Sequence, residues 1–69
     1  MNINKIKARM RELGKTQSDV ANSLKINSST FNRKINRADG YYLSIKEARE
    51  LIEYLDIPIE EVSLYFFNN

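Results

Sequence analysis

Residues 16–36 have the sequence TQSDVANSLKINSSTFNRKIN, and its apolar residues recur at helical spacing in two separate groups. The first group consists of Val20, Ala21 and Leu24. The second consists of Phe31 and Ile35. Residues three or four positions apart lie on one face of a helix, so the spacing predicts two short helices. Only residues 25–27, Lys-Ile-Asn, separate them, and we expect a tight turn there.

Capping residues precede both predicted helices. Thr16 and Asn27 carry side-chain oxygens that can accept a hydrogen bond from an exposed N–H group of the first turn. Ser28, Ser29 and Thr30 are weak helix formers, but they are tolerated in a first turn because their side chains can satisfy the backbone there. We therefore expect the second helix to begin directly after Asn27.

The second predicted helix has a polar face without an acidic residue. The circumference left by its apolar stripe carries Ser29, Asn32, Arg33, Asn36 and Arg37. An arginine can donate two parallel hydrogen bonds to O6 and N7 of guanine in the major groove, and an asparagine can pair with adenine. The exposed N–H groups of a first helical turn favour a nearby phosphate. This face fits the major groove of DNA, although a face that is only solvated would have a similar composition.

The flanking segments predict further helices. Before residue 16, an apolar stripe of Ile3, Ile6, Met10 and Leu13 is followed by Gly14, which is suited to end a helix. After a loop at residues 37–42, Ser44 and Glu47 form a capping box. The stripe that follows consists of Ala48, Leu51, Ile52 and Leu55. Pro58 is expected to stop this helix and to begin a last short one with Glu60, Glu61, Val62 and Leu64.

The predicted fold class is all-α: a compact bundle of five short helices in one domain spanning residues 1–69. The chain contains no cysteine, so its stability must come from packing and not from disulfides or thiolate-bound metal. Its apolar runs are too short to span a membrane, and its first ten residues alternate charged and apolar side chains, unlike a signal peptide. We therefore expect a cytoplasmic protein without a metal or cofactor.

Charge is divided unevenly along the chain. Residues 1–38 contain nine Lys and Arg against two acids, and residues 39–69 contain two against seven. The net charges are +7 and −5, which suggests one face for a polyanion and another kept away from it. The alternative is that the two sets of solvated helix faces differ by chance. Lys5, Lys7, Arg9 and Arg11 are expected to form such a solvated face.

An enzyme is not expected. The chain has no His or Cys and only two Gly, so no nucleophile, paired base or phosphate-binding glycine loop is evident. Acidic residues could suggest carboxylate catalysis, but we expect them on surface helix faces. These residues are Glu47, Glu50, Glu53, Glu60 and Glu61.

Two short helices joined by a tight turn, the second of them polar and basic, match the helix-turn-helix pattern. Residues 16–36 resemble the lambda Cro and repressor-like DNA-binding domains, especially small Cro-like regulators of bacterial phages. The resemblance rests on Thr16-Gln17 at the helix start, on Ala21 at the helix contact and on the core positions Leu24, Ile26, Phe31 and Ile35. Two positions depart from the family pattern: Lys25 stands where glycine is usual, and Lys34 where an apolar residue is frequent.

The resemblance implies roles for individual residues. Base-contacting positions correspond to Ser28, Ser29, Asn32 and Arg33. Phosphate-contacting positions correspond to Gln17, Asn27, Lys34, Asn36 and Arg37, and the loop residues Tyr41 and Tyr42 are expected to join them. The partner would be a double-stranded, palindromic DNA operator in a bacterial cell, bound by a homodimer that acts as a transcriptional repressor.

The aromatic C-terminus suggests how two copies meet. A single helix-turn-helix contacts few base pairs, so two copies on adjacent half-sites are usual. We expect dimer contacts from Val62, Leu64, Tyr65, Phe66 and Phe67. The competing expectation is that this tail folds back on its own helices. A second function also stays open: a small interaction module, or anti-repressor, that binds another repressor through the acidic half and the tail.

Overall fold

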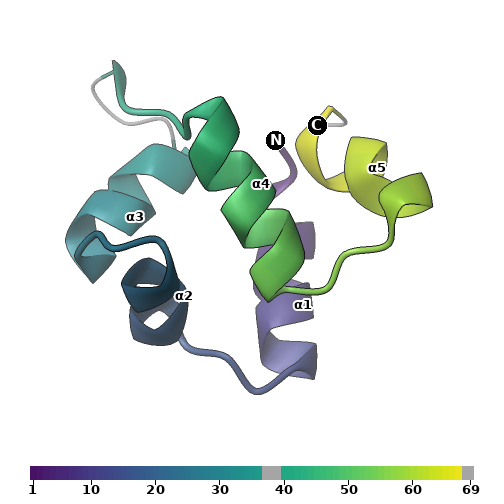
Figure 1. Cartoon of the computed structure of the whole chain (residues 1–69), viewed down its shortest axis with the longest axis horizontal. Coiled ribbons are helices and arrows are strands. Elements are labelled where there is room, and N and C mark those ends of the chain that lie inside the picture. Colours follow the sequence, from purple (N-terminus) through teal and green to yellow (C-terminus); the bar gives the residue numbers. More distant parts are fainter. Residues whose placement is uncertain (37–39, 68–69) are drawn as a thin grey trace.

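The computed structural model describes residues 1–36 and 40–67, and within these residues the chain is all-helical, as predicted. Five α-helices are described: α1 (Ile3–Glu12), α2 (Gln17–Ser23), α3 (Ser28–Asn36), α4 (Ile45–Tyr54) and α5 (Val62–Phe66). A 3-10 turn, η2 (Ile59–Glu61), leads into α5. Figure 1 shows α4 crossing the middle of the molecule, with α2 and α3 on one side and α5 on the other. No described helix has the length and hydropathy of a membrane span.

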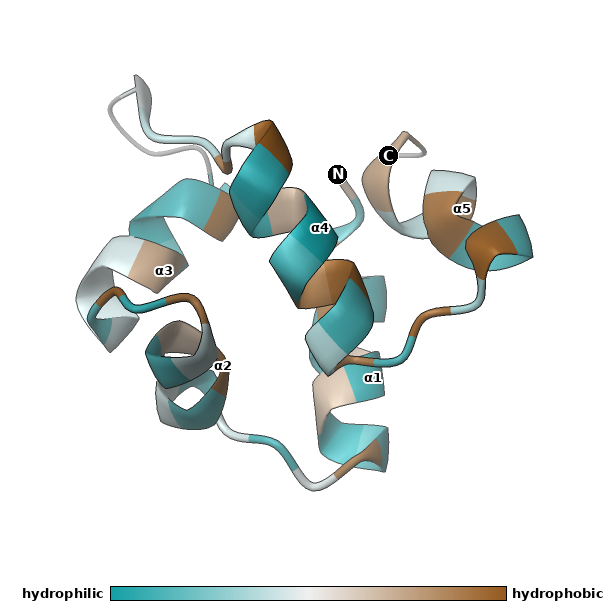
Figure 2. Cartoon of the chain, in the orientation of Figure 1, coloured by the Kyte–Doolittle hydropathy of each residue, from teal (hydrophilic) through white to brown (hydrophobic). Residues whose placement is uncertain are grey.

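One apolar core joins these helices. Its buried members are Ile6, Met10, Val20, Ala21, Leu24, Phe31, Ile35, Leu51, Leu55, Ile57 and Tyr65. Each of the five α-helices contributes at least one of them. Hydrophilic colours cover much of α3 in Figure 2, whereas much of α5 is brown. The predicted stripes therefore face a shared interior, and α3 combines two buried residues with a polar outer side.

The predicted starts of α2, α3 and α4 are confirmed, whereas Glu60 and Glu61, expected in the last helix, lie in the 3-10 turn before α5. Thr16 and Ser44 each form a complete capping box, with Asp19 and Glu47 as the respective third residues. The Asn27 side-chain oxygen accepts a hydrogen bond of 2.7 Å from the Thr30 N–H group, which explains why α3 begins with weak helix formers. A cap of this kind contributes about 1 kcal/mol to stability.

Helices α1, α2 and α4 end in the same motif. In each, the residue after the cap has positive φ: Gly14 (70°), Lys25 (60°) and Asp56 (50°). The next N–H group reaches back five residues, from Lys15 to Met10, from Ile26 to Ala21 and from Ile57 to Ile52. This is the Schellman arrangement, which satisfies the last carbonyl groups of a helix. Lys25, which stands where glycine is usual in the resembled family, thus has a positive φ, a conformation that costs a residue other than glycine about 1–2 kcal/mol.

Three expectations about the helices, two on which side chains are buried and one on where a helix ends, are wrong. Leu13, the C-cap residue of α1, is 38% exposed and not part of the core. Pro58 does not end α4, which stops at Tyr54 through the positive φ of Asp56. Arg9 does not lie on a solvated face, since its guanidinium donates to the carbonyl oxygens of Leu55 and Asp56. Helix α4 ends earlier than expected because the Schellman turn at Asp56 precedes Pro58.

The C-terminal aromatics divide between core and surface. Tyr65 is only 5% exposed, and its carbonyl oxygen accepts a hydrogen bond of 2.7 Å from the Asn2 N–H group. Val62 and Phe66 are partly buried against the core. Leu64 and Phe67 are exposed. Tyr65 is therefore a core residue that offers little surface to a second copy, which corrects its expected role as a dimer contact.

Candidate nucleic-acid interface

Helix α3 packs against α2 through its two apolar residues. Phe31 and Ile35 are almost completely buried, as are Val20 and Ala21 of α2. The small Ala21 side chain allows a close approach of the two helices, and Ile26 in the turn between them packs against the core. The turn is held by the Schellman bonds from Lys25 and Ile26 to α2. Helix α3 is therefore held against α2, and most of the side chains outside its apolar stripe are exposed.

The four residues expected to contact bases are all exposed. Ser28 and Ser29 lie in the first turn of α3, and Asn32 and Arg33 lie one turn later. No acidic residue occurs in α3. Nine residues of α-helix extend about 13 Å, and a helix of this diameter fits the major groove of B-DNA. The outer side of α3 thus offers hydroxyl, amide and guanidinium groups without a negative charge.

Two asparagines at the ends of this face have internal hydrogen bonds. The Asn27 oxygen that caps α3 also accepts a bond of 2.8 Å from the Ser29 hydroxyl. The Asn36 side-chain amide donates to the backbone carbonyl and the side-chain oxygen of Asn32, each at 2.8 Å. These contacts orient Ser29 and Asn32, although both side chains remain exposed. Asn27 and Asn36 thus lie at the two ends of α3, the first before its first residue and the second as its last.

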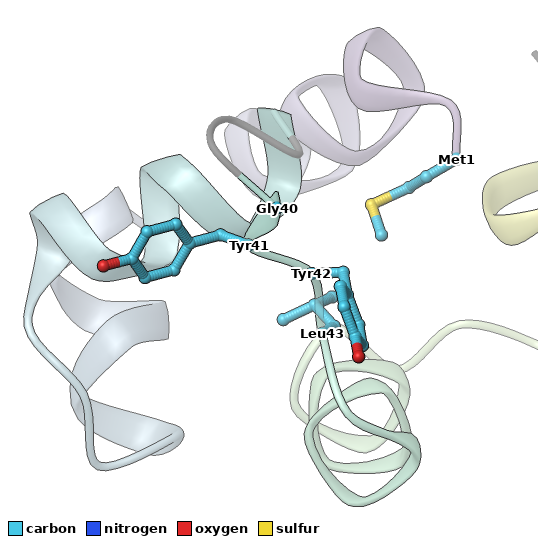
Figure 3. A pocket seen from close by; sticks show the side chains of 5 residues that line it. All are labelled: Met1, Gly40, Tyr41, Tyr42 and Leu43. Atoms are coloured by element: carbon cyan, nitrogen blue, oxygen red, sulfur yellow. The ribbon is translucent and has the colours of Figure 1, made fainter.

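Arg33 lies over the ring of Tyr41. The distance from the guanidinium carbon to the ring centroid is 5.8 Å, within the range of a cation–π contact. Figure 3 shows Tyr41 pointing away from Tyr42 and Leu43, which lie beside Met1 at a hollow of about 450 Å³. Tyr41 and Tyr42 are 39% and 68% exposed. Tyr41 is therefore placed to support Arg33, a role that the sequence pattern did not suggest.

Lys34 points toward α4 and not outward. Its Nζ lies 2.9 Å from Oε1 and 2.7 Å from Oε2 of Glu47, and the two side chains are 20% and 14% exposed. Burial by itself raises the pKa of Glu47, but the hydrogen bonds from Lys34 and Ser44 outweigh this effect and lower it below the ordinary value. Glu47 is thus not on a surface face, and Lys34 is not positioned as a phosphate contact. Both expectations are corrected.

Of the remaining residues expected to contact phosphate, one lies at the start of α2 and one outside the described residues. Gln17 is the first residue of α2 and is partly exposed. Arg37 lies outside the described residues. Asp19 follows in the first turn of α2, where hydrogen bonds from Thr16 lower the pKa of its carboxyl group. The first turn of α2 therefore carries a carboxylate that is charged at neutral pH.

Sequence reasoning missed Glu47 as a partner of α3. The capping box identified its role within α4, but Lys34 lies 13 residues earlier in the chain. The only signal was the unusual lysine at a position where an apolar residue is frequent. A charged lysine that is removed from water requires an anionic partner, and seven acids follow Lys34 in residues 39–69.

Comparison of the chain with protein-family models, with curated proteins and with solved structures found no match. Its function is therefore inferred from the residues and geometry described above.

Proposed function

We propose that this chain is a sequence-specific regulator of transcription that binds double-stranded DNA, with α2 and α3 as a helix-turn-helix. The outer face of α3 carries the proposal: Ser28, Ser29, Asn32 and Arg33 are exposed together on a helix whose other side is buried. Arg33 would read guanine and Asn32 would read adenine. The two serines are short enough to let the first turn of α3 enter the groove deeply.

Charge supports a polyanionic partner. Residues 1–38, which include α1 to α3, have a net charge of +7. Cationic residues near α3 include Lys25 in the turn and Arg33 on the polar face. Contacts of Gln17, Asn27, Asn36 and Tyr42 with the phosphate backbone would set the register of α3 without reading the sequence. Arg37 belongs to the same proposed set, outside the described residues.

We further propose that two copies bind a palindromic operator and repress by occupancy. Helices α3 and α5 lie at opposite ends of the view in Figure 1, in a molecule whose longest dimension is 28 Å. Pairing through Leu64 of α5 and Phe67, the residue after this helix, would therefore hold two α3 helices far apart, as required by half-sites about 34 Å apart. Two partly buried residues, Val62 and Phe66, would border this contact.

The test is selection of bound duplexes from random DNA by the full chain. The expected result is a palindrome whose half-sites are separated by about one helical turn. Binding to the selected duplex should weaken with salt, with log K falling against log salt at a slope near −3 per domain, because about three phosphates are neutralised. A library without enrichment, or a slope near zero, would contradict the proposal.

The second candidate is an interaction module that binds another repressor protein. The observation that favours it is an apolar hollow of about 290 Å³ between α4 and α5, bordered by Ile45 and Phe67, which are 82% and 79% exposed. Sedimentation of the chain with a candidate repressor, with and without DNA, distinguishes the two functions. A complex that forms only without DNA, combined with no duplex enrichment, would favour the interaction module.

A further inference from the structure

The contact between Lys34 and Glu47 differs from an ordinary surface ion pair. The lysine nitrogen lies within 2.9 Å of both carboxylate oxygens, and both side chains are largely removed from water. Exposed ion pairs are screened by solvent and contribute little, whereas partly buried pairs are screened much less. Lys34 is therefore held in one position on α4, unlike the exposed Lys25 in the adjacent turn.

The position of Glu47 is also fixed by hydrogen bonds within its own helix start, independently of Lys34. It is the third residue of α4, where its Oε1 accepts a hydrogen bond of 2.9 Å from the Ser44 N–H group. Its own N–H group donates to the Ser44 hydroxyl at 3.0 Å. The capping box thus fixes the carboxylate at the start of α4, so α3 is joined to a rigid acceptor and not to a mobile side chain.

The ion pair separates the roles of two adjacent cations. Successive residues of a helix differ in direction by about 100°, so the anchoring of Lys34 on α4 leaves Arg33 on the outer side beside Tyr41. A lysine that swung outward could reach a phosphate in any register of the DNA. Such a contact would carry no sequence information.

We propose that Glu47 is a specificity-determining residue that holds Lys34 away from the DNA backbone. This inference rests on the proposed DNA-binding function. In the specific complex, base contacts by Arg33 fix the register of α3, and Lys34 remains on α4. On random DNA the register is not fixed, so a released Lys34 gains phosphate contacts there more easily. Glu47 thereby weakens non-specific binding more than specific binding.

The experiment compares wild type with Glu47→Gln on the selected duplex and on random duplex at several salt concentrations. Glutamine preserves the capping box, because its oxygen can still accept from Ser44, but it removes the charge that holds Lys34. On random DNA, we expect log K to fall more steeply with log salt by about 0.9 per copy, which corresponds to a roughly threefold larger loss of affinity between 50 and 200 mM salt. The ratio of specific to random affinity should decrease.

Two variants control for charge and for folding. Glu50→Gln removes an acid from the same hollow of α4 without changing the pair, and it should leave the salt slope unchanged. Lys34→Gln together with Glu47→Gln should restore the wild-type slope, since no released cation remains. Circular dichroism checks that each variant is folded. If Glu47→Gln does not fold, the single variant Lys34→Gln tests the inference. Because Lys34 makes no phosphate contact in wild type according to the inference, this variant should leave the slope of log K against log salt on random DNA unchanged. A shallower slope would overturn the inference.

A measurement without DNA separates this inference from the proposed function. Acetylation of the full wild-type chain should modify Lys34 more slowly than the exposed Lys46, and Glu47→Gln should bring Lys34 to the faster rate. Equal rates in wild type would overturn the role of Glu47, and so would an unchanged salt slope for Glu47→Gln in a chain that binds DNA. Failure of the wild type to bind any duplex, despite slow Lys34 acetylation, would overturn the proposed function and with it this role.

Discussion

Arg9 of α1 donates a hydrogen bond of 2.9 Å from Nε to the carbonyl oxygen of Leu55, the C-cap residue that follows α4. A second guanidinium nitrogen donates to the carbonyl oxygen of Asp56 at 2.7 Å. Carbonyl groups at a helix C-terminus have no partner within the helix and carry partial negative charge. One arginine therefore satisfies the end of α4 and joins two helices that are distant in sequence.

We expect Arg9→Ala to lower the free energy of unfolding by about 2 kcal/mol, because hydrogen bonds from a charged donor contribute about 1.5–3 kcal/mol. Urea unfolding followed by circular dichroism measures the change. Arg11→Ala is the matched control: it removes the same charge from an exposed position of α1 and should change stability by less than about 0.5 kcal/mol. Equal losses in the two variants would contradict a specific role of Arg9.

Lys25→Gly should stabilise the chain by about 0.5–1 kcal/mol. Glycine removes the conformational cost of a φ of 60° at this position. Glycine also loses more backbone entropy on folding than lysine does, but this loss is smaller than the gain. Lys25→Ala removes the charge but keeps the backbone cost, so it should not stabilise. Gly14→Ala should destabilise by about 1 kcal/mol through φ alone, because an added Cβ would meet no atom within 4 Å. Thermal unfolding measures all three variants.

Arg33→Ala should cost about 1–3 kcal/mol of binding at the selected operator and relax the preference at one base pair, if Arg33 reads guanine. Fluorescence titration with operator and random duplexes measures both affinities. Tyr41→Leu should reduce operator binding in the same direction but less, because it removes only the support of the guanidinium. Equal weakening of operator and random DNA by Arg33→Ala would identify it as a phosphate contact.

The C-terminal aromatics should respond differently to substitution. Tyr65→Ala should destabilise the chain by about 3 kcal/mol, as expected for a buried aromatic residue. Phe67→Ser should change stability by less than about 0.5 kcal/mol but abolish cooperative binding to two half-sites. Unfolding and titration of a two-site duplex measure these effects. Removal of residues 65–69 would be a poorer test, because it removes a core residue. Intact cooperativity in Phe67→Ser would exclude Phe67 from the dimer contact.

The contribution of Glu47 should depend on pH. Its pKa is lowered in the folded chain from an ordinary value of 4.5, so the unfolded chain binds more protons in this range. The stabilisation is therefore fully present above about pH 4.5 and is lost as the pH falls through the lower folded pKa. We expect the stability difference between wild type and Glu47→Gln to be constant from pH 7 to pH 5 and to shrink below pH 4. Asp19 titrates in both chains and does not affect the difference.

Local sequence was sufficient to predict the helices and their starts. Each capping bond of Thr16, Asn27 and Ser44 joins residues three positions apart. The apolar stripes follow from the helical period, and their burial was predicted for Phe31, Ile35 and most other core residues. These features depend on neighbours within about one helical turn, which the order of residues specifies directly. The polar face of α3 could be located for the same reason.

Contacts at the edges of the helix faces required the tertiary structure. A sequence period separates apolar from polar faces, but it does not tell which polar side chain at the boundary meets another helix. Arg9 and Leu55 are 46 residues apart, and Lys34 and Glu47 are 13 apart. The packing of the helices brings these pairs together, and it also places Tyr65 in the core while Phe67 stays exposed. Which cation of α3 faces outward was therefore decided by α4, whose carboxylate offers Lys34 a partner away from water.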